Sequence, residues 1–195
     1  MSFVTILYAA LFYFAATILF VGLAYRVYEY AKIPAPLKIP TPPAPMTQRG
    51  VAIRIFREVV FFESLFSATK WTWLFSWIFH LALLLAALRH LKYFTDPVWF
   101  WVSSELVQVA GHYAAYLMLA GLLGLFARRV FVDRVRYISS PSDYLILVLI
   151  IAIAGSGLMM KWFPSDILAI KLFFVGLLTF NFSELPSDAV LLIHL

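Results

Sequence analysis

Four apolar runs, each long enough to cross a lipid bilayer, divide the chain. They cover roughly residues 3–25, 71–92, 99–127 and 143–163. A helical crossing takes about 20 residues, and lipid leaves the backbone no water to bind, which favours helices. Only 13% of the 195 residues are charged, about half the fraction usual in a soluble domain. We therefore expect an all-α integral membrane protein.

A fifth apolar run begins after Pro186 with "SDAVLLIHL" and reaches Leu195. Its eight or nine residues make only about 13 Å of helix, which is far short of a crossing. We expect it to be a truncated fifth span, covering 188–195 and onward. Residues 164–187 are predicted to form a loop with a short surface helix. The chain is then a single membrane domain over residues 1–195, a bundle of five transmembrane helices.

Basic residues are unevenly distributed between the connections. Seven lie between the first and second runs, four between the third and fourth, and two in each remaining connection. Connections rich in Lys and Arg stay in the cytoplasm. This bias places the N-terminus outside the cell. The two basic connections contain Arg26, Lys32, Lys38, Arg49, Arg54, Arg57, Lys70, Arg128, Arg129, Arg134 and Arg136.

The connection over residues 32–70 has two parts. The first, "KIPAPLKIPTPPAPMTQRG", is Pro-rich and predicts an extended segment along the cytoplasmic surface. The second, residues 51–70, mixes charges with bulky apolar residues, as an interfacial amphipathic helix does. It can anchor the chain on the membrane surface, serve as a platform for a cytoplasmic partner, or do both.

All four histidines, His80, His90, His112 and His194, fall at membrane depth. An unpartnered polar group in hydrocarbon costs roughly 2–7 kcal/mol, so each needs a partner. Cysteine is absent, which excludes thiolate-held iron–sulfur clusters and covalently attached haem. Imidazole is the usual axial ligand of non-covalent haem. The histidines therefore indicate haem iron.

His80 and His90 are ten residues apart, about 15 Å along one helix and roughly 80° apart in direction. Both can face one bundle interior, which predicts two haems stacked across the bilayer. A fifth span that descends from outside brings His194 to the depth of His90, and we expect these two to ligate the outer haem. The second ligand of His80 is expected beyond Leu195. The alternative is that the histidines only bond neighbouring helices or serve a proton path, in a haem-free anchor.

Several motifs occur together in known membrane cytochromes. Phe79-His80 and His90 match the pattern F-H-x9-H, "RRVFVDRVRYISSPSD" over 128–143 is an arginine-rich connection, and "AVLLIHL" leads into His194. In these features the chain resembles the NarI-like gamma subunits of respiratory nitrate reductase, five-span dihaem cytochromes b that oxidise quinol. Residues 57–80 look closer to the cytochrome b subunits of Dsr and heterodisulfide-reductase-like menaquinol-oxidising complexes.

The resemblance implies an electron-transfer subunit of a quinol-oxidising oxidoreductase complex. It implies two haem b groups, and exchange of electrons between the menaquinone or quinone pool and a cytoplasmic iron–sulfur partner. Other membrane and periplasmic subunits are expected as partners, and nucleic acid is not. The expected location is the inner membrane of a prokaryote, as a multi-pass protein, with a link to sulfur metabolism.

The start of the third run carries polar residues that suit a quinol. Glu105, Gln108 and His112 fall on one helical face at i, i+3 and i+7. A carboxylate and an imidazole can accept the two protons that quinol oxidation releases. Three interpretations of His112 stay open: a quinone contact, a helix-packing residue or a haem ligand. We expect Arg89 to bind haem and Lys92 to bind quinone, unless both are ordinary interfacial anchors.

Overall fold

The computed structural model describes residues 1–34, 45 and 47–195, and those residues form helices and loops with no strand. Within this described part of the chain, four helices are long and apolar enough to cross a membrane. This confirms an all-α membrane fold, while a fifth crossing and the outward N-terminus stay predictions. The elements are α1 (Phe3–Lys32), α2 (Gln48–Phe61), α3 (Glu63–Ala68), α4 (Lys70–His90), the 3-10 turn η1 (Leu91–Tyr93), α5 (Glu105–Phe131), α6 (Asp133–Ile138), α7 (Pro141–Met159), α8 (Ile167–Thr179) and α9 (Ala189–His194).

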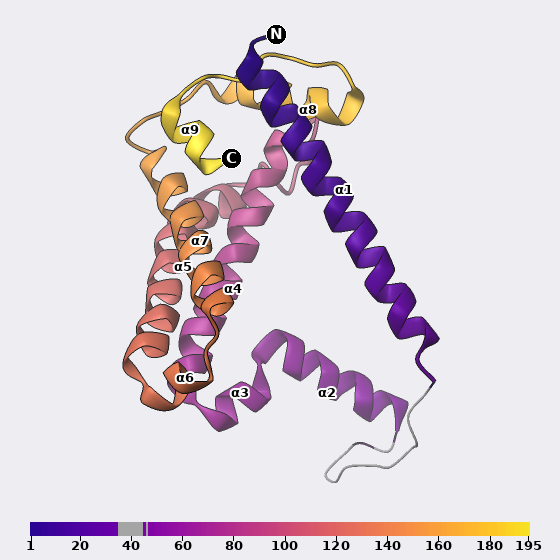
Figure 1. The fold of residues 1–195 in the computed structure, drawn as a ribbon, viewed down its shortest axis with the longest axis vertical. Coiled ribbons are helices and arrows are strands. Elements are labelled where there is room, and N and C mark those ends of the chain that lie inside the picture. Colours follow the sequence, from indigo (N-terminus) through magenta and orange to yellow (C-terminus); the bar gives the residue numbers. More distant parts are fainter. Residues whose placement is uncertain (35–44, 46) are drawn as a thin grey trace.

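Helices α4 and α5 run antiparallel and pack closely along their length (Figure 1). Two glycines of α5 permit this approach, because small residues let helix backbones meet. A Cβ at Gly121 would lie 2.9 Å from the Phe75 carbonyl oxygen and 3.0 Å from the Phe79 nitrogen. A Cβ at Gly124 would enter the Phe75 ring. Helix α7 covers another side of α5, so these three helices form one bundle with a core of Phe79, Ala82, Ala114, Met118, Leu122 and Ala154.

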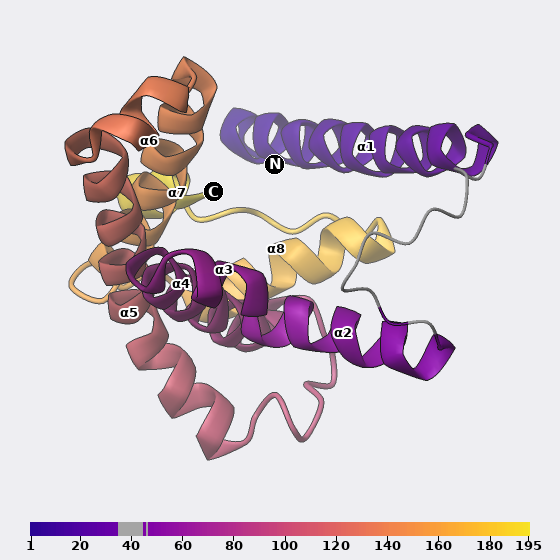
Figure 2. The ribbon, with the colours of Figure 1, turned by 90° about the horizontal axis from the view of Figure 1, so that it is seen from below.

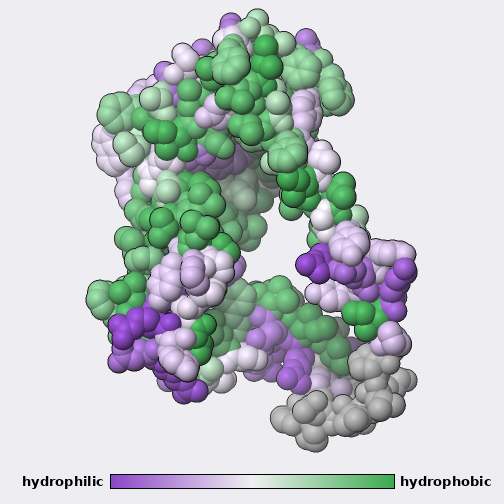
Figure 3. All heavy atoms as spheres, in the orientation of Figure 1, coloured by the Kyte–Doolittle hydropathy of each residue, from purple (hydrophilic) through white to green (hydrophobic). Residues whose placement is uncertain are grey.

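A second core lies at one end of the bundle. Helix α8 provides most of it, and α9 adds the buried Leu191. The first turns of α1 pack here, with the Tyr8 hydroxyl donating to the Leu192 carbonyl (2.7 Å) and the Tyr13 hydroxyl to the Leu177 carbonyl (2.6 Å). Beyond these turns α1 diverges from the bundle (Figures 1 and 2). The space-filling view shows an opening between them, bordered by apolar side chains (Figure 3).

The amphipathic segment forms two helices rather than the one predicted. The break is at Phe62, whose backbone is left-handed (φ 51°) and ends α2 before α3 starts. Two indoles of α4 hold this junction: Trp73 Nε1 donates to the Phe61 carbonyl at 2.6 Å, and Trp77 Nε1 to the Val60 carbonyl at 3.2 Å. These bonds satisfy carbonyls that the end of a helix leaves free. Most of the Pro-rich segment (35–44 and 46) lies outside the described residues.

The third span starts later than the apolar run suggests. Residues 99–104 form turns that bury Val102, and α5 begins at Glu105 after Ser104, whose hydroxyl accepts from the Val107 amide at 3.4 Å. Helix α8 lies where a short surface helix is predicted. Helix α9 has six residues, so this part of the structure does not test a fifth crossing.

We predict that Gly121→Ala destabilises the bundle, because the added methyl group meets the α4 backbone. Overpacking of this kind costs about 1–3 kcal/mol. Thermal unfolding of the purified protein in detergent should show a lower midpoint. Gly22→Ala is the matched control, because its Cβ would meet nothing within 4 Å. Equal midpoints for the two variants would contradict this account of the packing.

Candidate metal centre

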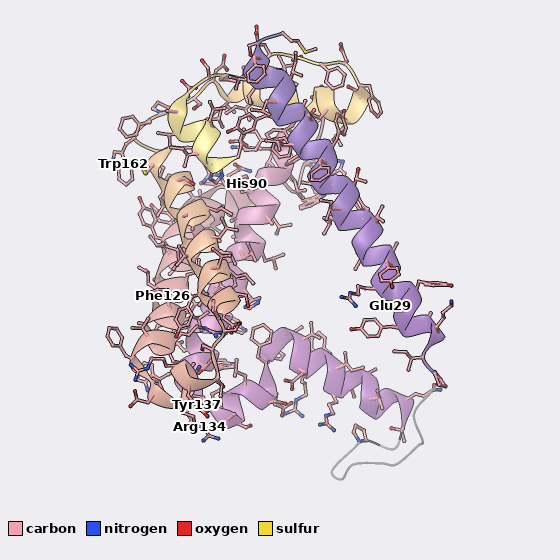
Figure 4. All side chains as sticks on the ribbon, in the orientation of Figure 1. Glu29, His90, Phe126, Arg134, Tyr137 and Trp162 are labelled. Atoms are coloured by element: carbon pink, nitrogen blue, oxygen red, sulfur yellow. The ribbon has the colours of Figure 1, made fainter. Side chains whose placement is uncertain are left out.

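Two histidine rings meet where the end of α4 faces α9. The ring centroids of His90 and His194 are 6.2 Å apart, with a 34° angle between the planes. Figure 4 shows His90 at the end of α4, directed toward the C-terminal end of α9. These residues are 104 positions apart in sequence. The fold therefore brings together the two histidines that the sequence predicts to lie at one depth.

Hydrogen bonds fix which nitrogen of each ring carries the proton. His90 Nδ1 lies 2.6 Å from the Ala86 carbonyl oxygen, and His194 Nδ1 lies 3.1 Å from the Ile153 carbonyl oxygen. A carbonyl oxygen only accepts, so each Nδ1 must donate its proton. In the neutral ring, each Nε2 then keeps a lone pair. Metal-ligating histidines usually show this pattern, with the other ring N–H donated to a carbonyl or carboxylate.

The separation of the two rings fits one metal ion between them. An imidazole nitrogen lies about 2 Å from a first-row metal ion that it binds, so two imidazoles on opposite sides of the ion hold their centroids about 6 Å apart. Neutral imidazole is a common axial ligand of haem iron. The donor set and the 6.2 Å separation therefore fit a bis-imidazole haem.

Helix α7 supplies the surface on which His194 lies. A Cβ at Gly157 would be 2.9 Å from His194 Cε1, so any side chain larger than that of glycine would collide with the ring. The Ser156 hydroxyl lies 3.2 Å from His194 Nδ1. The sequence pattern does not single out Ser156, which lies between Gly155 and Gly157. The only sequence signal is a serine between two glycines, which is also common at ordinary membrane helix contacts.

His80 lies on α4 about three turns from His90. Its Nδ1 is 2.7 Å from the Ser76 carbonyl oxygen, the same i−4 bond that His90 makes. The rings of Phe62 and Phe79 pack against it, with centroids 5.0 and 4.8 Å away. His80 is exposed on this chain. Among the residues that the structure describes, no other imidazole contacts it.

Arg89 lies beside His90, in a notch on α5. A Cβ at Gly111 would be 2.9 Å from both Cβ and Cδ of Arg89, so the aliphatic stem lies against the glycine. Within the described part of the chain, the Arg89 guanidinium makes no ion pair. A charged group at membrane depth normally has a partner. Arg89 is thus available to an anionic group near His90.

The residues predicted to contact quinone do not form one cluster. Gln108 faces η1: its Oε1 is 3.5 Å from Lys92 Nζ, and its Nε2 donates to the Val102 carbonyl at 2.7 Å. Glu105 and His112 are exposed. The His112 backbone carbonyl accepts from Lys161 Nζ at 2.9 Å. Gln108 and Lys92 therefore lie together, while the other two side chains remain free for an outside ligand.

Comparisons with known proteins indicate the family of this chain. The nitrate reductase gamma subunit family matches residues 62–184, a range that includes His80 and His90 and ends before His194. An "Hdr-like menaquinol oxidoreductase cytochrome b-like subunit" from Archaeoglobus fulgidus is 33% identical over 208 residues, covering 87% of this chain and 63% of the relative. A protein of the same name from Archaeoglobus profundus is 32% identical over 226 residues, covering 95% and 66%. The chain thus spans about two thirds of the length of these relatives. No solved structure gives a significant match.

Cysteine substitution tests the proximity of the two rings directly. The chain has no cysteine, so a pair introduced by His90→Cys and His194→Cys contains its only thiols. We expect a short bifunctional maleimide to link this pair in membranes, detected as a linked peptide by mass spectrometry. The control pair, His80→Cys with His194→Cys, is separated by about a further 15 Å along α4 and should remain unlinked. Equal yields for the two pairs would refute the arrangement.

Proposed function

Because the chain belongs to the nitrate reductase gamma subunit family, we propose that it is a membrane cytochrome b subunit. It carries electrons between menaquinol and a cytoplasmic iron–sulfur partner subunit. The observation that carries this proposal is the His90–His194 pair, with centroids 6.2 Å apart and each Nδ1 bonded to a carbonyl. The names of the Archaeoglobus relatives support menaquinol as the electron donor.

His90 and His194 would together hold the iron of the outer haem in this proposal. Haem iron, when bound, takes up and releases one electron at a time. The chain's own residues hold the two rings in place: the Ala86 carbonyl fixes His90, and α7 fixes His194. Because each Nδ1 donates to a carbonyl, the neutral form of each ring is the tautomer with a bare Nε2.

His80 is the ligand of a second haem in this proposal. Its bond to the Ser76 carbonyl leaves Nε2 free in the same way as for His90. The two sites are about 15 Å apart along α4, so they lie at different depths. Phe62 and Phe79 pack on the ring and limit its orientations. The α2–α3 junction, held by Trp73 and Trp77, thus lies against the His80 site.

Arg89 neutralises a haem propionate in this proposal. A guanidinium binds a carboxylate with paired hydrogen bonds. Its stem is fixed in the Gly111 notch, one residue from His90. The interaction compensates a positive charge at membrane depth, which is otherwise costly.

Menaquinol binds near the outer end of α5 in this proposal. Glu105 and His112 are exposed and can accept the protons that oxidation releases. Lys92 and Gln108 form a separate pair, and their 3.5 Å contact is long enough to rearrange around a ligand. The protons would then leave toward the outer surface, and a haem held by His90 would supply the acceptor for the electrons.

The electrons leave through the side that carries α2, α3 and α6. Basic residues gather there, Arg134 and Arg136 among the exposed ones. By the charge bias this side is cytoplasmic, which is where an iron–sulfur partner of heterodisulfide-reductase type would dock. The protein is then a multi-pass subunit of a complex in the cytoplasmic membrane of a prokaryote.

Reduced-minus-oxidised absorption spectra of the purified complex test the proposal. The complex should show b-type α-bands. His90→Ala and His194→Ala should each remove the same component, about half of the haem, because either change leaves that iron without an axial ligand. His80→Ala should remove the other component.

His112→Ala is the matched control, and both components should persist in it. A complex without any b-type band would favour the haem-free anchor instead. Loss of different components in the His90 and His194 variants would contradict the pairing.

A further inference from the structure

A serine on α7 touches the imidazole of His194. Ser156 is buried, and its Oγ lies 3.2 Å from His194 Nδ1 and 3.0 Å from the Ile153 carbonyl oxygen. The same carbonyl lies 3.1 Å from His194 Nδ1. Three polar atoms from two helices thus form a closed triangle in an otherwise apolar contact. Neither the comparisons nor the sequence pattern assigns a role to Ser156.

The directions of these hydrogen bonds follow from what each atom can do. The Ile153 carbonyl oxygen can only accept, so it receives the Ser156 hydroxyl proton and also the proton of His194 Nδ1. Because the hydroxyl donates to Ile153, its lone pairs are free to accept from His194 Nδ1 as well. The Nδ1–H is thereby shared between two acceptors, both on α7, and Nε2 carries no proton.

This arrangement sets His194 apart from the other two proposed ligands. His80 and His90 each bond a carbonyl of their own helix, four residues earlier. Those bonds form within α4 and do not depend on how α4 packs against other helices. His194 instead bonds residues 38 and 41 positions away, on a different helix. Its orientation therefore depends on tertiary contact, and among the described residues Ser156 is the one side chain that lies within hydrogen-bond distance of its ring.

We propose that Ser156 is a positioning residue that fixes the tautomer and orientation of His194 and lowers the reduction potential of the haem that His194 holds. The inference rests on the proposed function. An imidazole whose Nδ1–H donates to an acceptor is more basic at Nε2, as is known for metal sites with such partners. A more basic ligand stabilises the oxidised iron relative to the reduced iron. Loss of the hydroxyl therefore raises the potential.

Potentiometric titration of the intact complex in membranes, followed at the b-type α-bands, tests this inference. Ser156→Ala should raise the midpoint potential of the His90–His194 component by up to about 59 mV, which corresponds to a tenfold change in a one-electron equilibrium. The other component should not move, so it serves as an internal control for folding. Ser156→Thr keeps the hydroxyl and should return the potential toward that of the natural protein.

Ser142→Ala is the matched control. It makes the same chemical change on the same helix, 14 residues away, where the hydroxyl is hydrogen-bonded to Ser140. Both potentials should stay unchanged. Equal potentials in Ser156→Ala and the natural protein would overturn the inference, and so would a Ser156→Thr variant that shifts as far as Ser156→Ala.

The spectra distinguish a failure of the proposed function from a failure of the role of Ser156. If the natural complex has no b-type band, the proposed function fails. If it has both components and the Ser156→Ala variant leaves them unmoved, only the role of Ser156 fails. If Ser156→Ala loses the outer component entirely while Ser156→Thr retains it, the hydroxyl still positions His194, and the stronger effect is on haem retention.

Discussion

The close contact between α4 and α5 is the constraint on which the rest of the structure depends. Both proposed ligands of α4 take their position from it, because Gly121 and Gly124 bring the α4 backbone and Phe75 directly against α5. The same approach places Arg89 in the Gly111 notch. In lipid, helices associate through such close packing rather than through the exclusion of water. Small residues at these few positions therefore determine where the polar side chains of the membrane interior lie.

The imidazoles of His80, His90 and His194 offset the cost of burying their polar atoms in the same way, by donating Nδ1–H to a helix carbonyl. Carbonyls in a helix already accept one bond, but each oxygen has a second lone pair. This satisfies the ring inside hydrocarbon and leaves Nε2 for a ligand. A satisfied Nδ1–H would also stabilise the histidines of a haem-free anchor. Such an anchor would not require two rings 6.2 Å apart, each with an unprotonated Nε2. The free Nε2 atoms are therefore the feature that favours haem.

The sequence predicts the membrane helices and the shared depth of His90 and His194, because depth follows from counting residues along apolar runs. Sequence-based prediction fails for those features that depend on tertiary contacts. The break at Phe62 occurs without glycine or asparagine, the residues that usually adopt a left-handed backbone. The later start of α5 depends on a turn that buries Val102. Ser156 looks like any small polar residue of a membrane helix until α9 is placed against it.

A cryo-EM map of the intact complex in lipid nanodiscs tests the central claim most directly. The account predicts density for one haem between α4 and α9, with its iron bonded to Nε2 of His90 and Nε2 of His194. Iron held by any other pair of residues, or two adjacent imidazoles with no iron between them in a complex that contains haem, would contradict it.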